Sequence, residues 1–339
     1  MSIVMTGGGT GGHLAIVDAV KEHIDNKELI YIGSIKGQDR AWFKNDNSFA
    51  KSYFLQTQGV MDKGKIGKVF ALFNIIKKVF EARKILKKHN AKVVFSVGGF
   101  SAAPAAIAAV SLKIPLVISE QNAYIGNLNR LLKPFATAFI SAYEDGKLGR
   151  IYPVKSIYFE NARVRNNLKN ILIVGGSQGS IALNSFALQI APKLNKMGVK
   201  IYHQAGEKNL EKVEQEYKKL GIDAKVFGFT KEMPNLIKNA DFAISRAGAS
   251  TLWEMVANGL PALFVPYPYA TNDHQYYNAK FLADKNLGCI VRENELNKEM
   301  FFNLLNSCNL QEVSAKLQNE IKPDGAKKIA KYLEGFEED

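Results

Sequence analysis

The sequence D-F-A-I-S-R-A-G-A-S-T-L-W-E-M-V-A-N-G-L-P-A-L-F-V-P, residues 241–266, predicts a strand, a turn, a helix and a second strand. The apolar run at 242–245 is typical of a buried strand. Gly248 permits a sharp turn, and Ser250 or Thr251 can cap a helix that the following glycine and proline terminate. Backbone N–H groups and the positive end of the helix dipole then lie at the strand's carboxyl end. This junction therefore predicts a phosphate-binding site in an α/β protein.

Two further features of this stretch point to a nucleotide sugar. Glu254 follows Thr251 by three residues, where its carboxylate can accept hydrogen bonds from the two hydroxyls of a ribose. The same spacing is that of a capping box, in which Glu254 would instead bind a backbone N–H. The loop after the next strand holds N-D-H-Q at 272–275, and this edge of an open sheet is where ligands bind. Polar side chains suited to sugar hydroxyls, so close to the phosphate junction, favour the ribose interpretation.

Composition indicates a folded protein with an anionic partner. The chain has 339 residues, of which 47% are hydrophobic and 23% charged, enough for two ordinary domains. Two cysteines support neither a disulfide framework nor a cysteine-based metal site, so we expect a reducing compartment. The N-terminus lacks the pattern of a signal peptide, and no run approaches the roughly 18–20 apolar residues of a membrane span. The net charge of +13 favours a membrane surface, a nucleic acid or a phosphorylated substrate.

The rest of the chain repeats the strand-loop-helix pattern in two halves. Each half opens with a short apolar run followed by glycines, G-G-G-T-G-G-H at 7–13 and G-G-S-Q-G-S at 175–180. Alternating strands and helices predict a parallel sheet covered on both faces. We therefore expect an α/β protein of two Rossmann-like, doubly wound domains that face a cleft. The polar segment at 144–155 is a suitable linker between them.

The first glycine loop contains G-x-G-x-x-G, a weak signal for dinucleotide binding. A nicotinamide cofactor would also need an acidic residue at the end of the second strand to hold a ribose. Asp39, in the following loop, is the nearest one, so the sequence argues against this cofactor.

A basic and apolar segment runs from Lys63 to Lys88 and carries nine basic residues against one acidic residue, Glu81. One interpretation is that it forms core-facing helices with solvated lysines. The other, which the number of large apolar residues favours, is an amphipathic patch that lies on anionic lipid. Nucleic acid is not the expected partner, because no recognised nucleic-acid motif accompanies this segment.

Motifs for other chemistries are missing from the sequence. There is no D-x-D, no metal-ligand spacing of His, Cys or Asp, and no G-x-S-x-G nucleophile motif. A second polar cluster, Glu120, Gln121 and Asn122, follows a predicted strand, where it would form part of a site or cap a helix. Displacement at the anomeric carbon of a sugar needs a bound donor, a stabilised leaving group and a general base.

Five motifs together closely resemble the MurG family, and they occur in the family's order: G-G-T-G-G-H at 8–13, G-G-F-S-A-A-P at 98–104, E-Q-N-A-Y-I-G-N-L-N-R at 120–130, G-G-S-Q-G-S at 175–180 and R-A-G-A-S-T-L-W-E at 246–254. Members of this family transfer N-acetylglucosamine from UDP-N-acetylglucosamine to lipid I, the undecaprenyl-pyrophosphoryl-N-acetylmuramyl-pentapeptide, and so form lipid II of peptidoglycan. The resemblance implies a GT-B fold, an inverting reaction, and neither a cofactor nor a metal. It also implies an acceptor- and membrane-binding domain at 1–155, a donor-binding domain at 156–322 and a helix at 323–339 that returns to the first domain.

The resemblance further implies a set of donor-contacting residues, at the strand ends of both halves: Thr10, Gly11, Gly12, Asn122, Arg165, Ser177, Thr230, Ala249, Ser250, Thr251, Glu254, His274 and Gln275. By this likeness Asn122 contacts the sugar and Ser177 the diphosphate, while Thr230 presents its backbone to uracil. Glu254 holds the ribose, and Gln275, with His274, the sugar hydroxyls.

The sequence departs from the family pattern in two places. The family's N-P-V-R appears as N-A-R-V-R at 161–165, so either Arg163 or Arg165 corresponds to the phosphate-binding arginine. The residue before Glu120 is Ser119, where the family often has histidine. His13 is therefore the expected general base, the alternative being that it only orients the first glycine loop.

By the same likeness the protein is peripheral, on the cytoplasmic face of the plasma membrane, with the anionic membrane surface and cell-wall synthesis proteins as further partners. The alternative functions are another lipid glycosyltransferase or a UDP-N-acetylglucosamine 2-epimerase on the same fold, or a membrane adaptor without activity.

Overall fold

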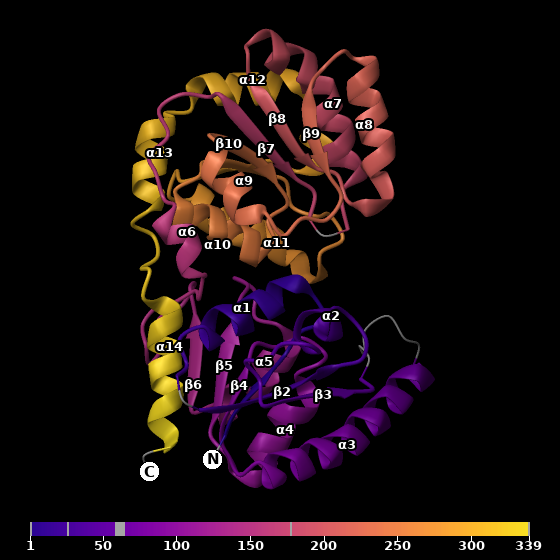
Figure 1. The fold of residues 1–339 in the computed structure, drawn as a ribbon, viewed down its shortest axis with the longest axis vertical. Coiled ribbons are helices and arrows are strands. Elements are labelled where there is room, and N and C mark those ends of the chain that lie inside the picture. Colours follow the sequence, from indigo (N-terminus) through magenta and orange to yellow (C-terminus); the bar gives the residue numbers. More distant parts are fainter. Residues whose placement is uncertain (1, 26, 58–64, 177, 338–339) are drawn as a thin grey trace. The chain divides into compact units, whose positions relative to one another are not determined.

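The computed structural model describes residues 2–25, 27–57, 65–176 and 178–337, and the chain forms two compact units. Unit 1 comprises residues 1–155 and 324–339, and unit 2 comprises residues 156–323 (Figure 1). None of the helices in the described ranges is long and apolar enough to cross a bilayer.

Unit 1 is built on a six-stranded parallel sheet in the order β3-β2-β1-β4-β5-β6. Its strands are β1 (Ser2–Thr6), β2 (Glu28–Ser34), β3 (Lys51–Leu55), β4 (Ala91–Ser96), β5 (Leu116–Glu120) and β6 (Ala138–Ser141). The helices of this unit are α1 (Gly11–Lys21), α2 (Asp39–Phe43), α3 (Lys65–Lys88), α4 (Ala103–Leu112), α5 (Asn127–Leu132) and α14 (Gly325–Glu334). Short 3-10 turns follow at η1 (Lys133–Phe135) and η5 (Gly335–Glu337).

Unit 2 repeats this plan, with the sheet order β12-β11-β10-β7-β8-β9. Its strands are β7 (Asn170–Val174), β8 (Lys200–Gln204), β9 (Ala224–Phe227), β10 (Phe242–Ser245), β11 (Ala262–Phe264) and β12 (Cys289–Ile290). Its helices are α6 (Ser156–Glu160), α7 (Ile181–Lys196), α8 (Leu210–Lys219), α9 (Met233–Asn239), α10 (Ala249–Asn258), α11 (His274–Ala283), α12 (Lys298–Ser307) and α13 (Leu310–Leu317). Three 3-10 turns, η2 (Glu207–Asn209), η3 (Thr271–Asp273) and η4 (Glu293–Glu295), lie in the connecting loops.

The continuous apolar sequences of the strands explain why both sheets are buried. Strand β1 is buried at every position, and so is β10, because helices cover both faces of the sheets. In unit 2 the core between the sheet and helices α7, α8 and α12 includes Phe186, Tyr217 and Phe301. In unit 1 helix α4 contributes four fully buried alanines, which let it approach the sheet closely. The predicted fold of two doubly wound α/β domains is confirmed.

The final helix belongs to unit 1. Helix α14 packs against α1, and its Ile329, Ala330 and Leu333 are fully buried. The backbone N–H of Asp25, beyond the end of α1, donates to Glu334 Oε1 at 3.1 Å. The segment that follows residue 323 therefore completes the core of unit 1.

Candidate functional site

The strand order places the candidate site in each unit. In both sheets the order reverses beside a central strand, between β1 and β4 in unit 1 and between β7 and β10 in unit 2. Helices that follow the two strands of such a pair lie on opposite faces, which leaves a crevice at their carboxyl ends. A glycine-rich loop follows each of the strands β1, β4 and β7, and the loop after β10 is R-A-G. Four of the five motifs thus lie at these two positions, and the fifth, at 120–130, follows the neighbouring strand β5.

The loop between β7 and α7 brings backbone N–H groups to the carboxyl edge of unit 2. Ser180 caps α7, since its Oγ accepts from the N–H of Leu183 at 3.3 Å. Gly179 has φ +74°, and a Cβ there would lie 2.2 Å from the carbonyl oxygen of Ala205. Only glycine permits this approach, so the loop packs directly on the end of β8. The helix dipole of α7 and this loop suit a phosphate group. Ser177 lies outside the described residues.

A buried polar relay supports the same loop. Asn184, in the first turn of α7, donates to the carbonyl oxygen of Ala205 at 3.1 Å, and its Oδ1 lies 3.0 Å from His203 Nε2. His203 Nδ1 lies 3.0 Å from the Tyr217 hydroxyl. Burial lowers the pKa of His203 to about 3, so its ring is neutral at neutral pH. The ring then donates to Asn184 and accepts from Tyr217, which fixes its tautomer.

Arg246, which we did not single out from the sequence, connects the loops after four strands. Its guanidinium donates to Ser180 Oγ at 2.7 Å and to the carbonyl oxygens of Val265 and Pro266, each at 3.1 Å. It also forms an ion pair with Glu293, after β12. Arg246 is the first residue of the motif R-A-G-A-S-T-L-W-E, and this position is the sequence signal that could have identified it as a site residue.

Helix α10 begins earlier than the sequence predicts. Gly248 occupies the N-cap position and Ala249 is the first helical residue, so neither Ser250 nor Thr251 caps the helix. Glu254 lies in the second turn, half-buried, and its Oε1 accepts from the Ser250 hydroxyl at 2.7 Å. The capping-box alternative is therefore wrong, because Thr251 lies inside the helix and is not its cap.

The loop after β11 places His274 and Gln275 in the first turn of α11. Gln275 Oε1 accepts from the backbone N–H of Tyr267 at 3.0 Å, and His274 Nδ1 lies 2.9 Å from the carbonyl oxygen of Thr271. Asp273 forms a two-point ion pair with Arg292, at 2.9 and 2.6 Å. The loop is thus fixed at both ends, and it borders the same carboxyl edge as Glu254.

Thr230 follows β9 at the far side of this edge. Its hydroxyl accepts from the backbone N–H of Glu232 at 2.9 Å. The neighbouring Phe229 donates its backbone N–H to Glu207 Oε1 at 2.7 Å and leaves half of its side chain exposed. The turn that Thr230 forms is therefore held by its own side chain, with an exposed aromatic ring beside it.

Arg165 lies away from the loops described above, and its phosphate contact stays a prediction from the resemblance. The side chain is fully buried, and its guanidinium donates to carbonyl oxygens of Ile237, Ala240 and Asn258. These groups lie at or just beyond the carboxyl ends of α9 and α10, where unpaired carbonyls and the negative end of the dipole attract a cation. Burial and then the charge of Arg163 lower the pKa of Arg165 to about 9. Arg163 pairs with Asp241 at 2.7 Å on the same side.

In unit 1 a buried carboxylate holds the first glycine loop. Asp39, with no exposed surface, accepts from the backbone N–H of Gly9 at 2.7 Å and of Ser34 at 2.9 Å. The Tyr31 hydroxyl lies 3.1 Å from the same carboxylate and donates to the carbonyl oxygen of Gly7 at 2.8 Å. Asp39 thus supports the loop from beneath and cannot hold a ribose, which argues further against a nicotinamide cofactor.

The predicted base lies at the start of α1. Thr10 is the N-cap residue, Gly11 and Gly12 form the first two helical positions, and His13 follows. The Thr10 hydroxyl lies 2.9 Å from His13 Nδ1. A Cβ at Gly99, in the loop after β4, would lie 3.5 Å from His13 Cε1. The half-buried His13 ring therefore lies where two glycine loops of unit 1 meet.

Asn122 lies in the loop after β5, and the buried Glu120 organises this loop. One carboxylate oxygen of Glu120 accepts from the backbone N–H of Asn122 at 2.9 Å; the other accepts from Gly126 N and Asn129 Nδ2, also at 2.9 Å. Glu120 is therefore a structural residue of the site, and Asn122 remains half-buried at the edge.

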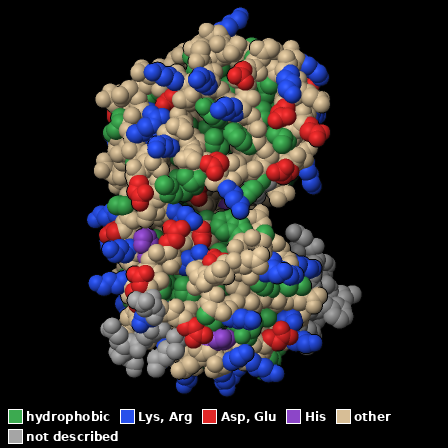
Figure 2. All heavy atoms as spheres, viewed as in Figure 1, with side chains coloured by type: hydrophobic (Ala, Val, Ile, Leu, Met, Phe, Trp, Pro, Cys, Tyr) green, Lys and Arg blue, Asp and Glu red, His purple; other side chains and the backbone are tan. Residues whose placement is uncertain are grey.

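From Lys65 onward the basic segment forms one helix, α3, whose described side chains begin at Asn74; Lys63 lies outside the described residues. Ala82 and Leu86 face the core, whereas Ile76 and Phe80 are 46% and 62% exposed. Leu131 and Phe135, in α5 and η1, are similarly exposed. Figure 2 shows Lys and Arg side chains along the edge of unit 1 that α3 forms. Large apolar side chains in water beside lysines are unusual for a helix that only covers a core.

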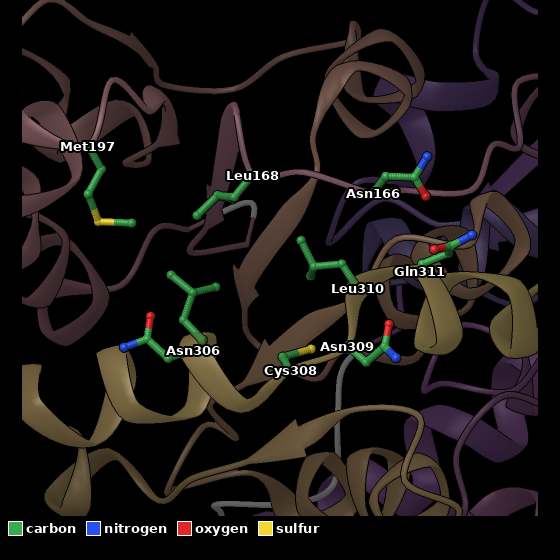
Figure 3. Close-up of a pocket in the computed structure, with 9 residues that line it drawn as sticks. Asn166, Leu168, Met197, Asn306, Cys308, Asn309, Leu310 and Gln311 are labelled. Carbon is green, nitrogen blue, oxygen red and sulfur yellow. The ribbon is translucent and has the colours of Figure 1, made fainter.

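A cavity of about 320 Å³ lies in unit 2, away from these loops (Figure 3). Leu168, Met197 and Leu310 contribute to its lining. Leu168 precedes β7 and Met197 ends α7, so the cavity lies at the amino edge of the sheet and not at the carboxyl edge.

Comparisons with known proteins agree with this architecture. The glycosyltransferase family 28 N-terminal domain matches residues 3–141, and the C-terminal domain of the same family matches residues 170–333. The UDP-N-acetylglucosamine--N-acetylmuramyl-(pentapeptide) pyrophosphoryl-undecaprenol N-acetylglucosamine transferase of Sulfurovum sp. (strain NBC37-1) is 53% identical over 99% of both chains. The protein of the same name from Wolinella succinogenes is 49% identical over 98% of this chain and 99% of its own.

A solved structure of a related protein also agrees with this architecture. The crystal structure of Acinetobacter baumannii MurG superposes with a TM-score of 0.79 at 28% identity, over 98% of this chain and 99% of that chain. The chain therefore belongs to glycosyltransferase family 28 and, within it, to the MurG family of N-acetylglucosaminyltransferases.

Proposed function

We propose that unit 2 binds UDP-N-acetylglucosamine at its carboxyl edge, and that unit 1 binds lipid I and supplies the base. The observation that carries this proposal is the pair of helix N-termini at the switch point of unit 2, α7 and α10, with the carboxylate of Glu254 beside them. Two helix N-termini favour a diphosphate, and a half-buried carboxylate favours a diol. The names of the relatives support this donor and acceptor.

The donor-site roles follow from these positions. The loop of Ser177 and the start of α7 hold the diphosphate, and Ala249, Ser250 and Thr251 line the nucleotide from the first turn of α10. Glu254 accepts hydrogen bonds from the ribose hydroxyls. A carboxylate can accept about four hydrogen bonds, and the Ser250 hydroxyl supplies one of them to Glu254.

The ends of the donor are bound by the outer loops. The turn at Thr230 presents backbone groups to uracil, while Gln275 and His274 contact the sugar hydroxyls at the start of α11. Thr10, Gly11, Gly12 and Asn122 contact the donor sugar from unit 1.

His13 removes the proton from the acceptor hydroxyl as that oxygen attacks the anomeric carbon. The bond to the UDP leaving group breaks with inversion, and the helix N-termini stabilise the charge that develops on the diphosphate. For Nε2 to accept the proton, Nδ1 must carry a hydrogen and donate it to the Thr10 hydroxyl, 2.9 Å away. The Thr10 hydroxyl can accept this hydrogen bond.

We also propose that the reaction needs no metal ion, because the helix N-termini and glycine loops neutralise the diphosphate and the sequence lacks D-x-D. Transfer to a lipid I analogue should proceed in EDTA. An absolute requirement for Mg²⁺ would refute this part of the proposal.

Unit 1 docks on the cytoplasmic face of the membrane through α3. The exposed Ile76 and Phe80 enter the interface, and the lysines of α3 attract anionic lipid, at about 1 kcal/mol each. This surface would present lipid I to the glycine loops of unit 1. Cell-wall synthesis proteins are further partners in this proposal.

The deciding experiment replaces Glu254. Glu254→Ala should raise the KM for UDP-N-acetylglucosamine at least tenfold, and it should leave vesicle binding unchanged. A co-crystal with the donor should show the ribose at this carboxylate. Unchanged donor KM, or a nucleotide bound away from α7 and α10, would refute the proposed donor site.

A further inference from the structure

The turn that precedes α11 has an uncommon backbone conformation. Among the residues that the structure describes, five residues other than glycine have a positive φ, and only Asn272 and Asp273 are consecutive, each with φ +53°. The other three follow the ends of helices, where a left-handed residue is common. Asparagine and aspartate adopt this conformation one at a time, and two in succession persist only where their surroundings fix them. Contacts outside the turn must therefore hold it.

Arg292, just beyond β12, supplies contacts of this kind. Its two terminal nitrogens donate to the two carboxylate oxygens of Asp273, at 2.9 and 2.6 Å. The guanidinium also lies 4.0 Å from the ring centroid of Tyr276, in the first turn of α11. Two parallel hydrogen bonds fix the direction of a carboxylate as well as its position. The ion pair therefore fixes Asp273 relative to the start of the helix.

The next residue along the chain, Glu293, acts on the other end of the same loop. It forms the ion pair with Arg246, whose guanidinium donates to the carbonyl oxygens of residues 265 and 266, each at 3.1 Å. Arg292 and Glu293 are neighbours in the segment that follows β12. One short segment thus contacts, directly or through Arg246, both ends of the loop between β11 and α11.

This loop sets the position of Gln275, to which the proposed function assigns the sugar hydroxyls. Gln275 lies in the first turn of α11, two residues after Asp273, so a rotation of the turn moves its side chain directly. Its Oε1 accepts from the backbone N–H of Tyr267 at 3.0 Å, which ties the amide to the start of the loop. The direction of the Gln275 amide therefore depends on the two loop ends together.

We propose that Arg292 is a positioning residue for the sugar end of the donor, which acts by holding Asp273 in the turn that places Gln275. This inference rests on the proposed contact between Gln275 and the sugar hydroxyls. Arg292 itself does not touch the donor in this proposal. A binding residue that is held in place before the ligand arrives reduces the ordering that binding requires. Loss of Arg292 should therefore weaken the binding of the sugar and not that of the nucleotide.

The test compares the binding of UDP-N-acetylglucosamine with that of UDP, which lacks the sugar. Arg292→Gln should raise the Kd of UDP-N-acetylglucosamine about threefold to fivefold in calorimetry, because the ion pair that it breaks is about one-third exposed and partly screened by water. The Kd of UDP should stay within about twofold of the wild-type value. A merely structural loss would weaken both ligands, so an equal change of the two Kd values would overturn the inference, as would an unchanged Kd of UDP-N-acetylglucosamine.

Lys280→Gln is the matched control. It breaks an ion pair on the same helix, between Lys280 and Asp284 at 2.5 Å, which lies outside the turn. This variant should change neither Kd. If it weakens UDP-N-acetylglucosamine as much as Arg292→Gln does, the effect is not specific to the turn and the inference is wrong.

A double variant tests whether Arg292 acts through Asp273. Asp273→Asn removes the charge and keeps a residue that tolerates a positive φ. Adding it to Arg292→Gln should not raise the Kd of UDP-N-acetylglucosamine further, since the two substitutions remove the same contact. Additive effects would overturn the inference, and thermal unfolding of each variant checks that the fold is intact. Gln275→Ala tests the underlying function: if it leaves this Kd unchanged, the proposed sugar contact fails instead.

Discussion

The close contact between Gly179 and the end of β8 gives a quantitative prediction for donor binding. A Cβ at Gly179 would lie 2.2 Å from the carbonyl oxygen of Ala205, whereas ordinary contacts begin at 3.4 Å. Both groups are backbone, so Gly179→Ala must move the loop by about 1 Å. A misplacement of that size in a site can reduce the rate about 100-fold. We therefore expect kcat/KM for UDP-N-acetylglucosamine to fall roughly 100-fold in this variant.

Gly198 provides a matched control for the backbone conformation. Its φ of +73° is nearly that of Gly179, but nothing lies within 4 Å of a Cβ built there. Each substitution should lower the free energy of unfolding by about 1–2 kcal/mol, the expected cost of a left-handed alanine. Thermal unfolding measures this shared cost, and a continuous assay of UDP release measures kcat/KM. If Gly179→Ala and Gly198→Ala reduce kcat/KM equally, the loop does not bind the diphosphate as we propose.

Three further predictions address the base, the buried histidine and the membrane surface. His13→Gln should lower kcat by about 10²–10⁴ with little change in donor binding, measured by steady-state kinetics and calorimetry; normal kcat would exclude it as the base. His203 binds a proton more weakly in the folded state than in the unfolded state, with a pKa near 3, so stability falls as the pH drops below 6.5. Protonation of His203 in the unfolded state should lower the unfolding free energy of unit 2 by about 1 kcal/mol between about pH 7.5 and 5.5. Urea unfolding measures this pH dependence, and His203→Gln should remove it. If the variant keeps the same pH dependence, His203 is not its cause. Phe80→Glu should reduce sedimentation with anionic vesicles at least tenfold, and Leu220→Glu, an exposed apolar position in unit 2, should not; equal behaviour of the two variants would refute docking through α3.

The sequence predicts the central strands well because their physical signal is local. Strand β10 is bounded as predicted, since four consecutive apolar or small residues are buried on both faces. Strand β3 and helix α2 had no such signal. Strand β3 lies at the edge of its sheet, with the charged Lys51 exposed and only Leu55 buried, and α2 has five residues. A short or half-exposed helix or strand has too little hydrophobic periodicity to be recognised in the sequence.

The sequence motifs predict which segments form the candidate site, but they do not predict which groups the side chains contact. Glycine loops and the acidic residue at α10 follow from the local sequence, and they lie at the carboxyl edges as expected. The carbonyl groups at the ends of α9 and α10 that bind the Arg165 guanidinium lie 72–93 residues away in the sequence. The roles of Asp39 and Arg246 likewise depend on which backbone groups the fold brings together, and a single sequence does not contain that information.

Helix α14 has a practical consequence for handling the protein. It packs on α1, the helix whose first turn holds the predicted base, and its Ile329 and Leu333 are buried. Cutting the chain near residue 155 would separate the N-terminal sheet from a helix that it requires, and shortening the other end would remove the same support. The two units therefore cannot be exchanged between related proteins by a single cut in the chain. A chimera would have to take both segments of unit 1 from the same parent protein.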